Sequence, residues 1–169
     1  DVERSRGLGD VYKRQDFFTG NKNGSIDFEK TQILSPMRRY SSGLINLNSI
    51  MQKKYNPNGE KVFSKMEGEK EIQFCAGDKV ICTQNDYDID VRNGDIGYVV
   101  NKVGKNIRVE FDGEMKLFHN NKIDYLDLAY AITVHKSQGS EYPNVVMPIV
   151  DDHRIMLTRK LIYLSLIHI

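Results

Sequence analysis

The chain has 169 residues, of which 24 are Lys or Arg and 23 are Asp or Glu, so its net charge is +1. This balance excludes a general attraction of the chain to phosphate backbones, and any nucleic-acid binding must come from local placement of charge. Hydrophobic residues make up 40% of the chain, which excludes a disordered chain and allows one domain, or one domain with a small insertion.

The first predicted strand follows a long polar segment. Residues 1–30 are polar, contain several glycines and predict no regular element. Thr31–Ser35 is a short apolar run that ends before Pro36. Because the residue before a proline is biased away from helical conformation, this run predicts a buried strand that stops there.

A helix is predicted next. Apolar side chains recur at helical spacing over residues 44–55, Ser41 or Ser42 is a candidate for the N-cap, and Pro57 lies just beyond the end. Residues 57–70 are rich in glycine, lysine and glutamate. We therefore expect an exposed connector between the helix and the next part of the chain.

Residues 70–124 change to alternation of period two with frequent turns. Asn93-Gly94 and Asp112-Gly113 favour tight turns, because these residue types tolerate positive φ. The strand candidates are Glu71–Cys75, Lys79–Gln84, Asp95–Asn101, Asn106–Phe111 and Glu114–Phe118. So many short strands predict a small antiparallel barrel, whose thin core would lean on the domain that hosts it.

The α/β pattern returns at about residue 125. The apolar runs Leu128–Thr133 and Asn144–Val150 are separated by a polar turn, and Ile155–Tyr163 predicts the start of a helix. The two cysteines, Cys75 and Cys82, have no companions at metal-ligand spacing and fit strand positions in a reducing cytoplasm. No run of about 18 apolar residues is present, so no membrane span is expected.

The polar turn after residue 132 carries the strongest chemical signal. Its side chains are rich in hydrogen-bond donors, and Gly139 allows a backbone N–H to approach a ligand closely. The members are Thr133, His135, Lys136, Ser137, Gln138, Gly139 and Glu141. Such a turn at the end of a sheet strand is where α/β folds bind ligands, and it suits phosphates of a nucleotide or of DNA. From composition alone, a solvated surface turn is the commoner explanation.

The segment Ala129–Pro148 resembles motif V of the RecD-like branch of superfamily 1 DNA helicases. Other stretches resemble this branch in the same order. Gln32–Arg39 with Gly43, Asn48, Gln52 and Asn56-Pro57 resemble motif IV and its following helix; Gly77–Val80, Asn85, Tyr87 and Val91–Gly97 resemble its inserted Src-homology-3-like barrel; Met156–Tyr163 resembles the lead-in to motif VI. The resemblance extends from Thr31 to Tyr163.

The resemblance implies a partial RecA-like domain of the P-loop NTPase type, in residues 31–58 and 125–163, with the barrel inserted between them. It implies a bacterial cytoplasmic parent that uses ATP and Mg²⁺, translocates 5′ to 3′ on single-stranded DNA and unwinds duplex. The parent would supply a first, N-terminal RecA-like domain that this chain lacks. No Gly-x-x-x-x-Gly-Lys-[Ser/Thr] P-loop or acidic Walker B strand occurs here. The segment alone is therefore expected to bind no cofactor and to hydrolyse no ATP.

The resemblance also implies roles for individual residues. Those expected at ATP are Gly139, Glu141, Gln138 and the arginines Arg38 and Arg39, between which the sequence does not choose. Those expected at DNA are Thr133, His135, Lys136 and Ser137, and, on the barrel, Lys79, Asn85, Tyr87, Lys102, Lys105 and Arg108. A solvated surface is an equally good explanation for the arginines and a somewhat better one for each barrel residue. The acidic run Asp86, Asp88 and Asp90 argues against DNA there, and no metal site is predicted.

Both ends of the chain depart from the family pattern. His168 stands where the resemblance implies an arginine for the γ-phosphate, and an imidazole does not replace a guanidinium. Residues 1–15 and 164–169 resemble translated sequencing-adapter read-through, so we exclude them from fold reasoning.

Three other functions fit parts of the sequence. A conjugative relaxase motor carries a similar turn and would need a metal-binding histidine cluster upstream. A stand-alone DNA-binding barrel would bind oligonucleotide by itself with steep salt dependence. A folding scaffold would tolerate alanine at His135 and Gln138 without loss of DNA-stimulated ATPase.

Overall fold

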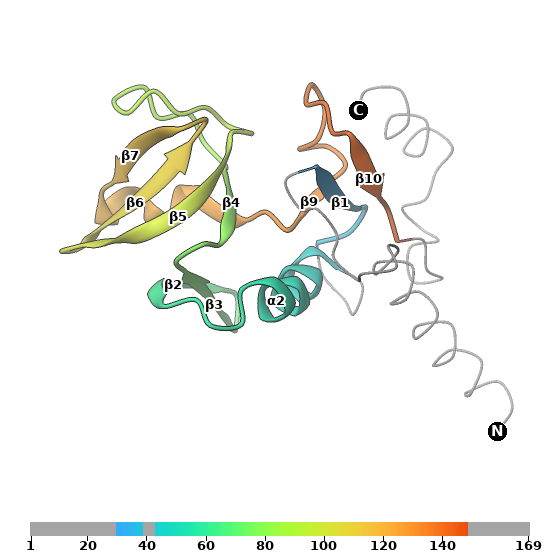
Figure 1. Cartoon of the computed structure of the whole chain (residues 1–169), viewed down its shortest axis with the longest axis horizontal. Coiled ribbons are helices and arrows are strands. Elements are labelled where there is room, and N and C mark those ends of the chain that lie inside the picture. The colour runs from blue at the N-terminus through green and yellow to red at the C-terminus, as the bar shows by residue number, and fades with distance from the viewer. Residues whose placement is uncertain (1–29, 39–42, 149–169) are drawn as a thin grey trace, which may run out of the picture.

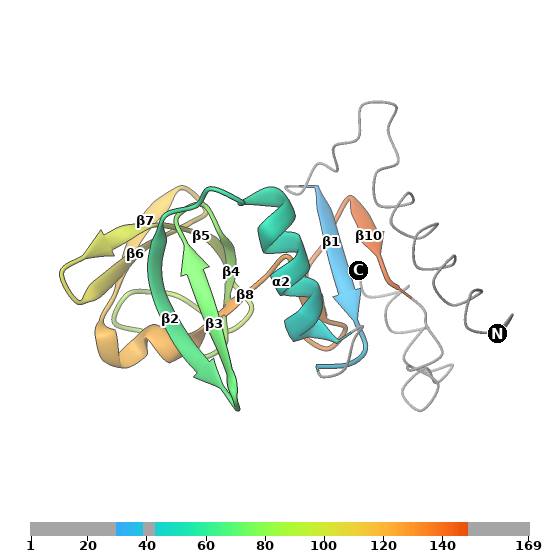
Figure 2. The same cartoon turned by 90° about the horizontal axis from the view of Figure 1, so that it is seen from below.

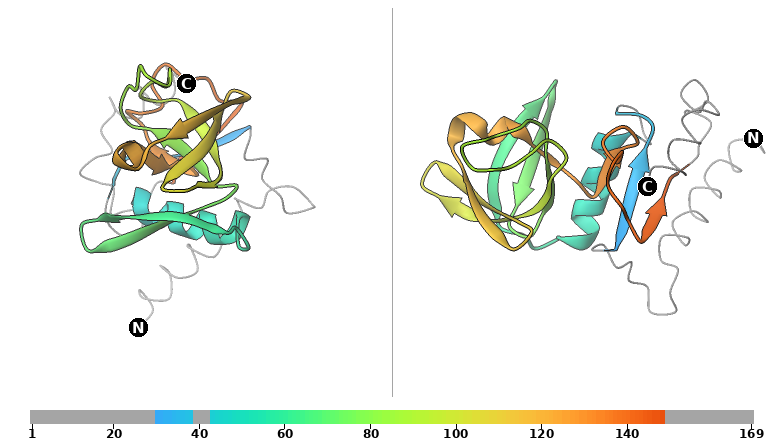
Figure 3. Two further views of the ribbon diagram at one scale, coloured as in Figure 1. Left: turned by 90° about the vertical axis from the view of Figure 1, so that its left-hand side faces the viewer. Right: turned by 90° about the horizontal axis from the view of Figure 1, so that it is seen from above.

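The computed structural model describes residues 30–38 and 43–148 (Figure 1). Two lobes lie side by side in them. One is a three-stranded sheet with helix α2, and the other is a five-stranded sheet with a separate hairpin. Figure 3 shows the two lobes from two further sides. The helix predicted at residues 155–163 and both chain ends lie outside the described residues.

The first lobe contains a parallel sheet. Strand β1 (Thr31–Ser35) lies between β9 (Ala131–Thr133) and β10 (Asn144–Val146), and both neighbours run parallel to it. All five residues of β1 are buried. A central parallel strand is covered on both faces, which explains why all of its positions are buried, including the polar Thr31, Gln32 and Ser35. The predicted strand at Thr31–Ser35 is thus confirmed.

Helix α2 (Leu44–Tyr55) confirms the predicted helix but not its predicted cap. Its N-cap position belongs to Gly43, which has no side chain to donate or accept. Two backbone hydrogen bonds replace the cap: Leu44 N donates to Met37 O at 2.9 Å, and Ile45 N donates to Arg38 O at 3.4 Å. The carbonyl groups of Met37 and Arg38 therefore accept from the first free N–H groups of the helix, so a serine cap is not required.

The predicted connector at residues 57–70 is wrong. Strands β2 (Lys61–Glu67) and β3 (Lys70–Cys75) form an antiparallel hairpin that turns at Gly68, where φ is +63°. Its inner face is held by a stack of Phe63 on Phe74, with ring centroids 4.1 Å apart. In β2 the charged residues Lys65 and Glu67 occupy half-buried positions while Met66 is exposed, so polarity does not alternate with burial and the strand was not recognised.

The second lobe contains the predicted antiparallel strands. Four of the five join β8 in a sheet of the order β7-β6-β5-β4-β8, whereas the predicted strand Glu71–Cys75 is β3 of the hairpin. The elements are β4 (Lys79–Cys82), β5 (Ile96–Val103), β6 (Asn106–Phe111), β7 (Glu114–Phe118), the 3₁₀ helix η1 (Asn120–Tyr125) and β8 (Leu126–Leu128). Gly97 permits the close approach of β5 to β6, because a Cβ there would lie 2.3 Å from Glu110 O. The Asp112-Gly113 turn has positive φ at both residues, as its sequence predicts.

The apolar run predicted at Leu128–Thr133 belongs to both lobes. Leu128 ends β8 in the barrel, whereas Ala131 begins β9 in the parallel sheet. The chain crosses between the lobes at Ala129 and Tyr130, which are both buried. The run is therefore one apolar segment in the sequence but two strands in the structure, because each lobe buries its own part of it.

Helix α2 joins the lobes through a row of amides. Asn48, Gln52 and Asn56 are spaced by four residues, so they lie on one face of the helix and at its end. Figure 2 shows α2 between the hairpin and β1. Asn48 pairs with the backbone of Ala131 in both directions: Nδ2 donates to Ala131 O at 3.0 Å, and Oδ1 accepts from Ala131 N at 2.8 Å.

The other two amides meet a buried carboxylate. Asp78, which is 0% exposed, accepts from Gln52 Nε2 at 2.5 Å and from Asn56 Nδ2 at 2.7 Å. It also accepts from Cys75 N at 2.6 Å and from the Tyr130 hydroxyl at 2.9 Å. Burial, together with this carboxylate, raises the pKa of Tyr130 well above its ordinary value, so its hydroxyl stays a donor. Asp78 thus ties the helix, the hairpin and the crossing segment together.

Asp78→Ala should lower the free energy of unfolding by about 2–4 kcal/mol, because it removes the acceptor of several buried donors at once. Tyr130→Phe removes one donor and should cost about 1 kcal/mol. Urea unfolding followed by circular dichroism measures both. Equal losses in the two variants would contradict the central role of the carboxylate.

Candidate functional site

The polar turn begins at the carboxyl edge of the parallel sheet. Thr133, the last residue of β9, is level with Ser35 at the end of β1. Strand β10 begins on the other side of β1, with Asn144 level with Thr31. Residues 134–143 therefore start at the carboxyl edge and cross to the opposite end of the sheet. The carboxyl edge of parallel strands is the usual ligand side of such sheets.

Internal hydrogen bonds fix the shape of this turn. The backbone N–H groups of Lys136 and Ser137 donate to Thr133 O at 3.0 and 3.2 Å. The Ser137 hydroxyl donates to Val134 O at 2.8 Å, and both of these residues are buried. Ser137 was predicted to contact DNA, but its hydroxyl is engaged inside the turn. Its position favours a role in holding the turn rather than in reaching a ligand.

The remaining predicted ligand residues of the turn face solvent. His135, Gln138, Gly139 and Glu141 are exposed, and Thr133 is half-buried. Gly139 has φ of +84°, which favours glycine, and a Cβ built on it would meet no atom within 4 Å. The backbone at Gly139 is therefore open to a close-approaching group such as a phosphate. A fixed turn with open donors can bind an anion without first folding around it.

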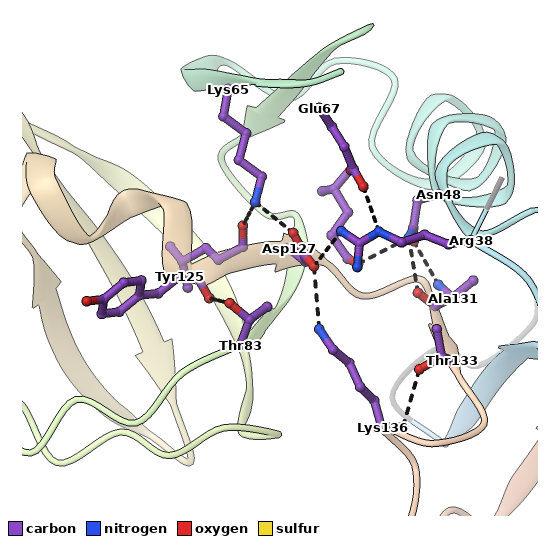
Figure 4. A network of polar contacts seen from close by, with 12 residues as sticks. Arg38, Asn48, Lys65, Glu67, Thr83, Tyr125, Asp127, Ala131, Thr133 and Lys136 are labelled. Atoms are coloured by element: carbon purple, nitrogen blue, oxygen red, sulfur yellow. Dashed lines mark hydrogen bonds and ion pairs between the residues drawn. The ribbon is translucent and has the colours of Figure 1, made fainter. Parts of the chain in front are cut away.

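Arg38 lies between the two lobes (Figure 4). Its Nε is 2.6 Å from Glu67 Oε1, near the tip of the hairpin, and its Nη2 is 3.4 Å from Asp127 Oδ2. The Arg38 side chain is about half exposed, so it stays accessible to solvent while it pairs with both carboxylates. Arg39, the second arginine predicted at ATP, lies outside the described residues.

Asp127, in β8, receives cations from three separate segments. Lys65 Nζ of β2 lies 2.7 Å from Oδ1, and Lys136 Nζ of the turn lies 3.4 Å from Oδ2, the oxygen that Arg38 also approaches. Burial favours the neutral carboxyl group, but the charges of Lys65, Lys136 and Arg38 outweigh it and hold the pKa of Asp127 below its ordinary value. The carboxylate is therefore ionised at neutral pH.

A pocket of about 350 Å³ opens beside this cluster, between α2 and the hairpin. Asn48 and Gln52 of the helix, Gln73 of β3 and Arg38 are among its lining residues. Asn48 and Gln52 of the amide row thus border the same space as Arg38, which was predicted to meet phosphate.

The barrel residues predicted at DNA differ in exposure. Tyr87 is 84% exposed, and Asn85, Lys102, Lys105 and Arg108 are also exposed. Lys79 is only 5% exposed, which leaves it no open face for a DNA strand. Asn85 shapes its loop as well, since its Oδ1 accepts from Asn93 N at 2.8 Å and its Nδ2 donates to the Tyr87 hydroxyl at 3.2 Å.

Two carboxylates of the acidic run beside Tyr87 share one lysine of the barrel. Lys122 Nζ of η1 lies 2.8 Å from Asp86 Oδ1 and 2.7 Å from Asp88 Oδ2. The hydrogen bond from Lys122 lowers the pKa of Asp88. Within residues 30–38 and 43–148, no group of three His, Cys, Asp or Glu side chains is placed to hold a metal ion.

The ion-pair residues Asp127, Lys65 and Glu67 were not predicted. The only local signal is the position of Asp127 between Leu126 and Leu128, an acid inside an apolar run. An acidic side chain between buried neighbours needs a cationic partner. The sequence could therefore have indicated that Asp127 is paired, but not that its partner is Lys65.

The chain matches two family models. Residues 47–111 match the ATP-dependent RecD-like DNA helicase SH3 domain, and residues 128–166 match the UvrD-like helicase C-terminal domain. An ATP-dependent RecD2 DNA helicase from Deinococcus radiodurans is 38% identical over 135 residues, which are 80% of this chain and 18% of that protein. The chain belongs to the RecD-like helicase family. The match to the RecD-like SH3 domain begins at residue 47, inside α2, so it includes the part of the helix that carries the amide row.

A second relative is the RecD subunit of the RecBCD enzyme of Haemophilus influenzae, 28% identical over 138 residues, or 82% of this chain and 20% of that subunit. The chain thus spans about a fifth of the length of these RecD-like relatives. The crystal structure of Pif1 helicase from Bacteroides in complex with ADP-AlF3 and ssDNA has a TM-score of 0.62 and 16% identity, over 89% of this chain and 41% of that chain. This likeness confirms the predicted fold, a partial RecA-like domain with a barrel insertion.

The described residues include no helix that is long and apolar enough to span a membrane.

The lowered pKa of Asp127 predicts an acid-dependent contribution to stability. A carboxyl group whose folded pKa lies below its unfolded value of about 3.9 stabilises the fold above that value and loses this contribution as pH falls through the folded pKa. The difference in unfolding free energy between wild type and Asp127→Asn should therefore shrink below about pH 4. Urea unfolding at pH 7, 5, 4 and 3 measures it. A difference that stays constant over this range would show that the charge of Asp127 contributes nothing to stability.

Proposed function

We propose that the intact protein is an ATP-dependent DNA helicase of the cytoplasm and that this segment supplies one wall of its ATP cleft and part of its DNA track. The observation that carries the proposal is the turn at residues 133–141, which is fixed by its own hydrogen bonds, open at Gly139 and located at the carboxyl edge of a parallel sheet. The Pif1 relative of the same fold is described in complex with ADP-AlF3 and ssDNA, which supports both ligands.

In this proposal the two sides of the turn meet different ligands. Gly139 offers its backbone to a nucleotide phosphate and Glu141 lies near the ribose, while Arg38 reaches towards phosphate. Thr133, His135 and Lys136 face the DNA backbone. Five exposed barrel side chains extend the DNA track, with aromatic stacking and phosphate neutralisation as the binding forces: Asn85, Tyr87, Lys102, Lys105 and Arg108.

ATP and Mg²⁺ are the proposed cofactors of the intact protein. When bound, they supply the phosphoryl group that is hydrolysed and the charge that stabilises it. The groups of this chain that fit a nucleotide are the open backbone of Gly139 and the cationic guanidinium of Arg38. We propose that the Mg²⁺ ligands and the phosphate-binding loop belong to the other RecA-like domain, and that movement along DNA is 5′ to 3′.

His135→Ala and Gln138→Ala in the intact protein should lower the rate of ATP hydrolysis stimulated by single-stranded DNA by at least about tenfold, because each removes an open donor from the proposed ligand face. A colorimetric phosphate assay with and without oligonucleotide measures the rate. His119→Ala and Gln84→Ala remove the same side chains from exposed barrel positions and should leave it unchanged. Full stimulation in folded His135→Ala protein would contradict the proposed role and favour a scaffold.

The 169-residue chain by itself should show no ATP hydrolysis and only weak binding to single-stranded DNA, because the proposed track and cleft are incomplete in it. Fluorescence anisotropy with a labelled oligonucleotide at 50 and 200 mM salt tests this. Tight binding with a steep loss at the higher salt, about 10³-fold or more, would favour a self-sufficient DNA-binding barrel instead.

A further inference from the structure

The two oxygens of Asp127 have different partners. Oδ1 accepts from Lys65 at 2.7 Å, and Lys65 also donates to Leu126 O at 2.5 Å. Oδ2 lies 3.4 Å from Arg38 and 3.4 Å from Lys136. Lys65 is therefore a fixed structural partner, whereas two other cations share the second oxygen.

The shared contacts are long. A hydrogen bond between a cation and a carboxylate usually measures about 2.7–2.9 Å, so neither Arg38 nor Lys136 has its full interaction with Oδ2. Arg38 has a second, closer carboxylate in Glu67, at 2.6 Å. Among the described residues, Lys136 forms an ion pair with Asp127 alone. Withdrawal of Arg38 would thus leave Oδ2 to Lys136.

The carboxylate itself is held in place. Asp127 lies between Leu126 and Leu128, which are both buried, and its own side chain is only 13% exposed. Lys65 fixes Oδ1 from the other side. Charge interactions are stronger in such a partly enclosed place than in bulk water. Arg38 and Lys136 can therefore replace one another at Oδ2 while the Asp127 carboxylate stays in place.

We propose that Asp127 is a positioning residue through which an anion bound at Arg38 and an anion bound at Lys136 oppose one another, by competition of the two cations for one carboxylate oxygen. The inference rests on the proposed function, which places a nucleotide phosphate at Arg38 and a DNA phosphate at Lys136. When the nucleotide draws Arg38 away, Lys136 closes on Oδ2 and is less available to DNA. By thermodynamic linkage, DNA at Lys136 weakens nucleotide binding by the same factor.

The barrel thereby takes part in communication between the two ligands. Arg38 follows β1 and Lys136 follows β9, so both lie in the lobe of the parallel sheet, but the oxygen that they share belongs to β8 of the barrel. The insertion acts here as the carrier of a counter-ion as well as a surface for DNA.

The test uses the intact protein and measures the dissociation constant of a labelled oligo-dT by fluorescence anisotropy, without and with a saturating non-hydrolysable ATP analogue. In wild type the analogue should weaken DNA binding about 5-fold or more, the lower end of typical coupling between sites. Asp127→Asn should bring the ratio of the two constants close to 1, with DNA bound more tightly than in wild type when the analogue is present. A merely structural loss would weaken binding instead.

Two controls accompany this variant. Asp124→Asn makes the same charge change at an exposed position in η1 and should keep the wild-type ratio. Asp127→Glu retains the carboxylate and should restore part of the coupling. The ratio of dissociation constants does not depend on the fraction of inactive protein, so partial unfolding of Asp127→Asn would not imitate the result.

Arg38→Gln tests the same idea without altering Asp127. It should bind DNA without nucleotide as weakly as wild type does with the analogue, and the analogue should have no further effect. A wild-type ratio in Asp127→Asn or in Arg38→Gln overturns the inference, and so does a wild-type protein whose DNA affinity ignores the analogue. Failure of the intact protein to bind DNA or to hydrolyse ATP overturns the proposed function itself.

Discussion

The docking of the barrel on helix α2 depends on one buried carboxylate. A barrel with so thin a core gains little from burying its own side chains and needs its host for stability. Asp78 provides the attachment because it accepts hydrogen bonds from the helix, the hairpin and the crossing segment at once. A buried charge is costly unless its partners surround it, so the same arrangement that satisfies Asp78 also fixes how the lobes are joined.

A second, more exposed layer of charge depends on that docking. Once the hairpin lies against α2, Lys65 and Glu67 are placed beside Asp127 and Arg38. The cluster contains three cations and two carboxylates, so it keeps an excess of positive charge near the polar turn. This excess is local, which agrees with a chain whose total charge is close to zero.

Local patterns predicted the elements whose apolar run or alternation is clear within the segment itself. The buried run Thr31–Ser35 and the alternating strands Asn106–Phe111 and Glu114–Phe118 match the structure in type and bounds. Strand β3 was predicted as Glu71–Cys75, but β2 was missed because its polarity does not alternate with its burial. The run at Leu128–Thr133 was not divided because both lobes bury apolar residues. The partners of Asp127 were beyond local reach, since Lys65 is 62 residues away in sequence. Contacts between residues so far apart depend on how the lobes pack, which the pattern of a short sequence segment does not show.

In the turn at residues 133–141 the backbone and the side chains differ in how firmly they are held. Its backbone is fixed by Thr133 O and by the buried Ser137, so a ligand does not have to order it. Its cationic side chain, Lys136, is instead held by a contact long enough to be exchanged. An exchange of side-chain partners could pass a signal through this turn without reshaping its backbone, and Lys136 is placed for it because the carboxylate oxygen that it contacts is already shared with Arg38.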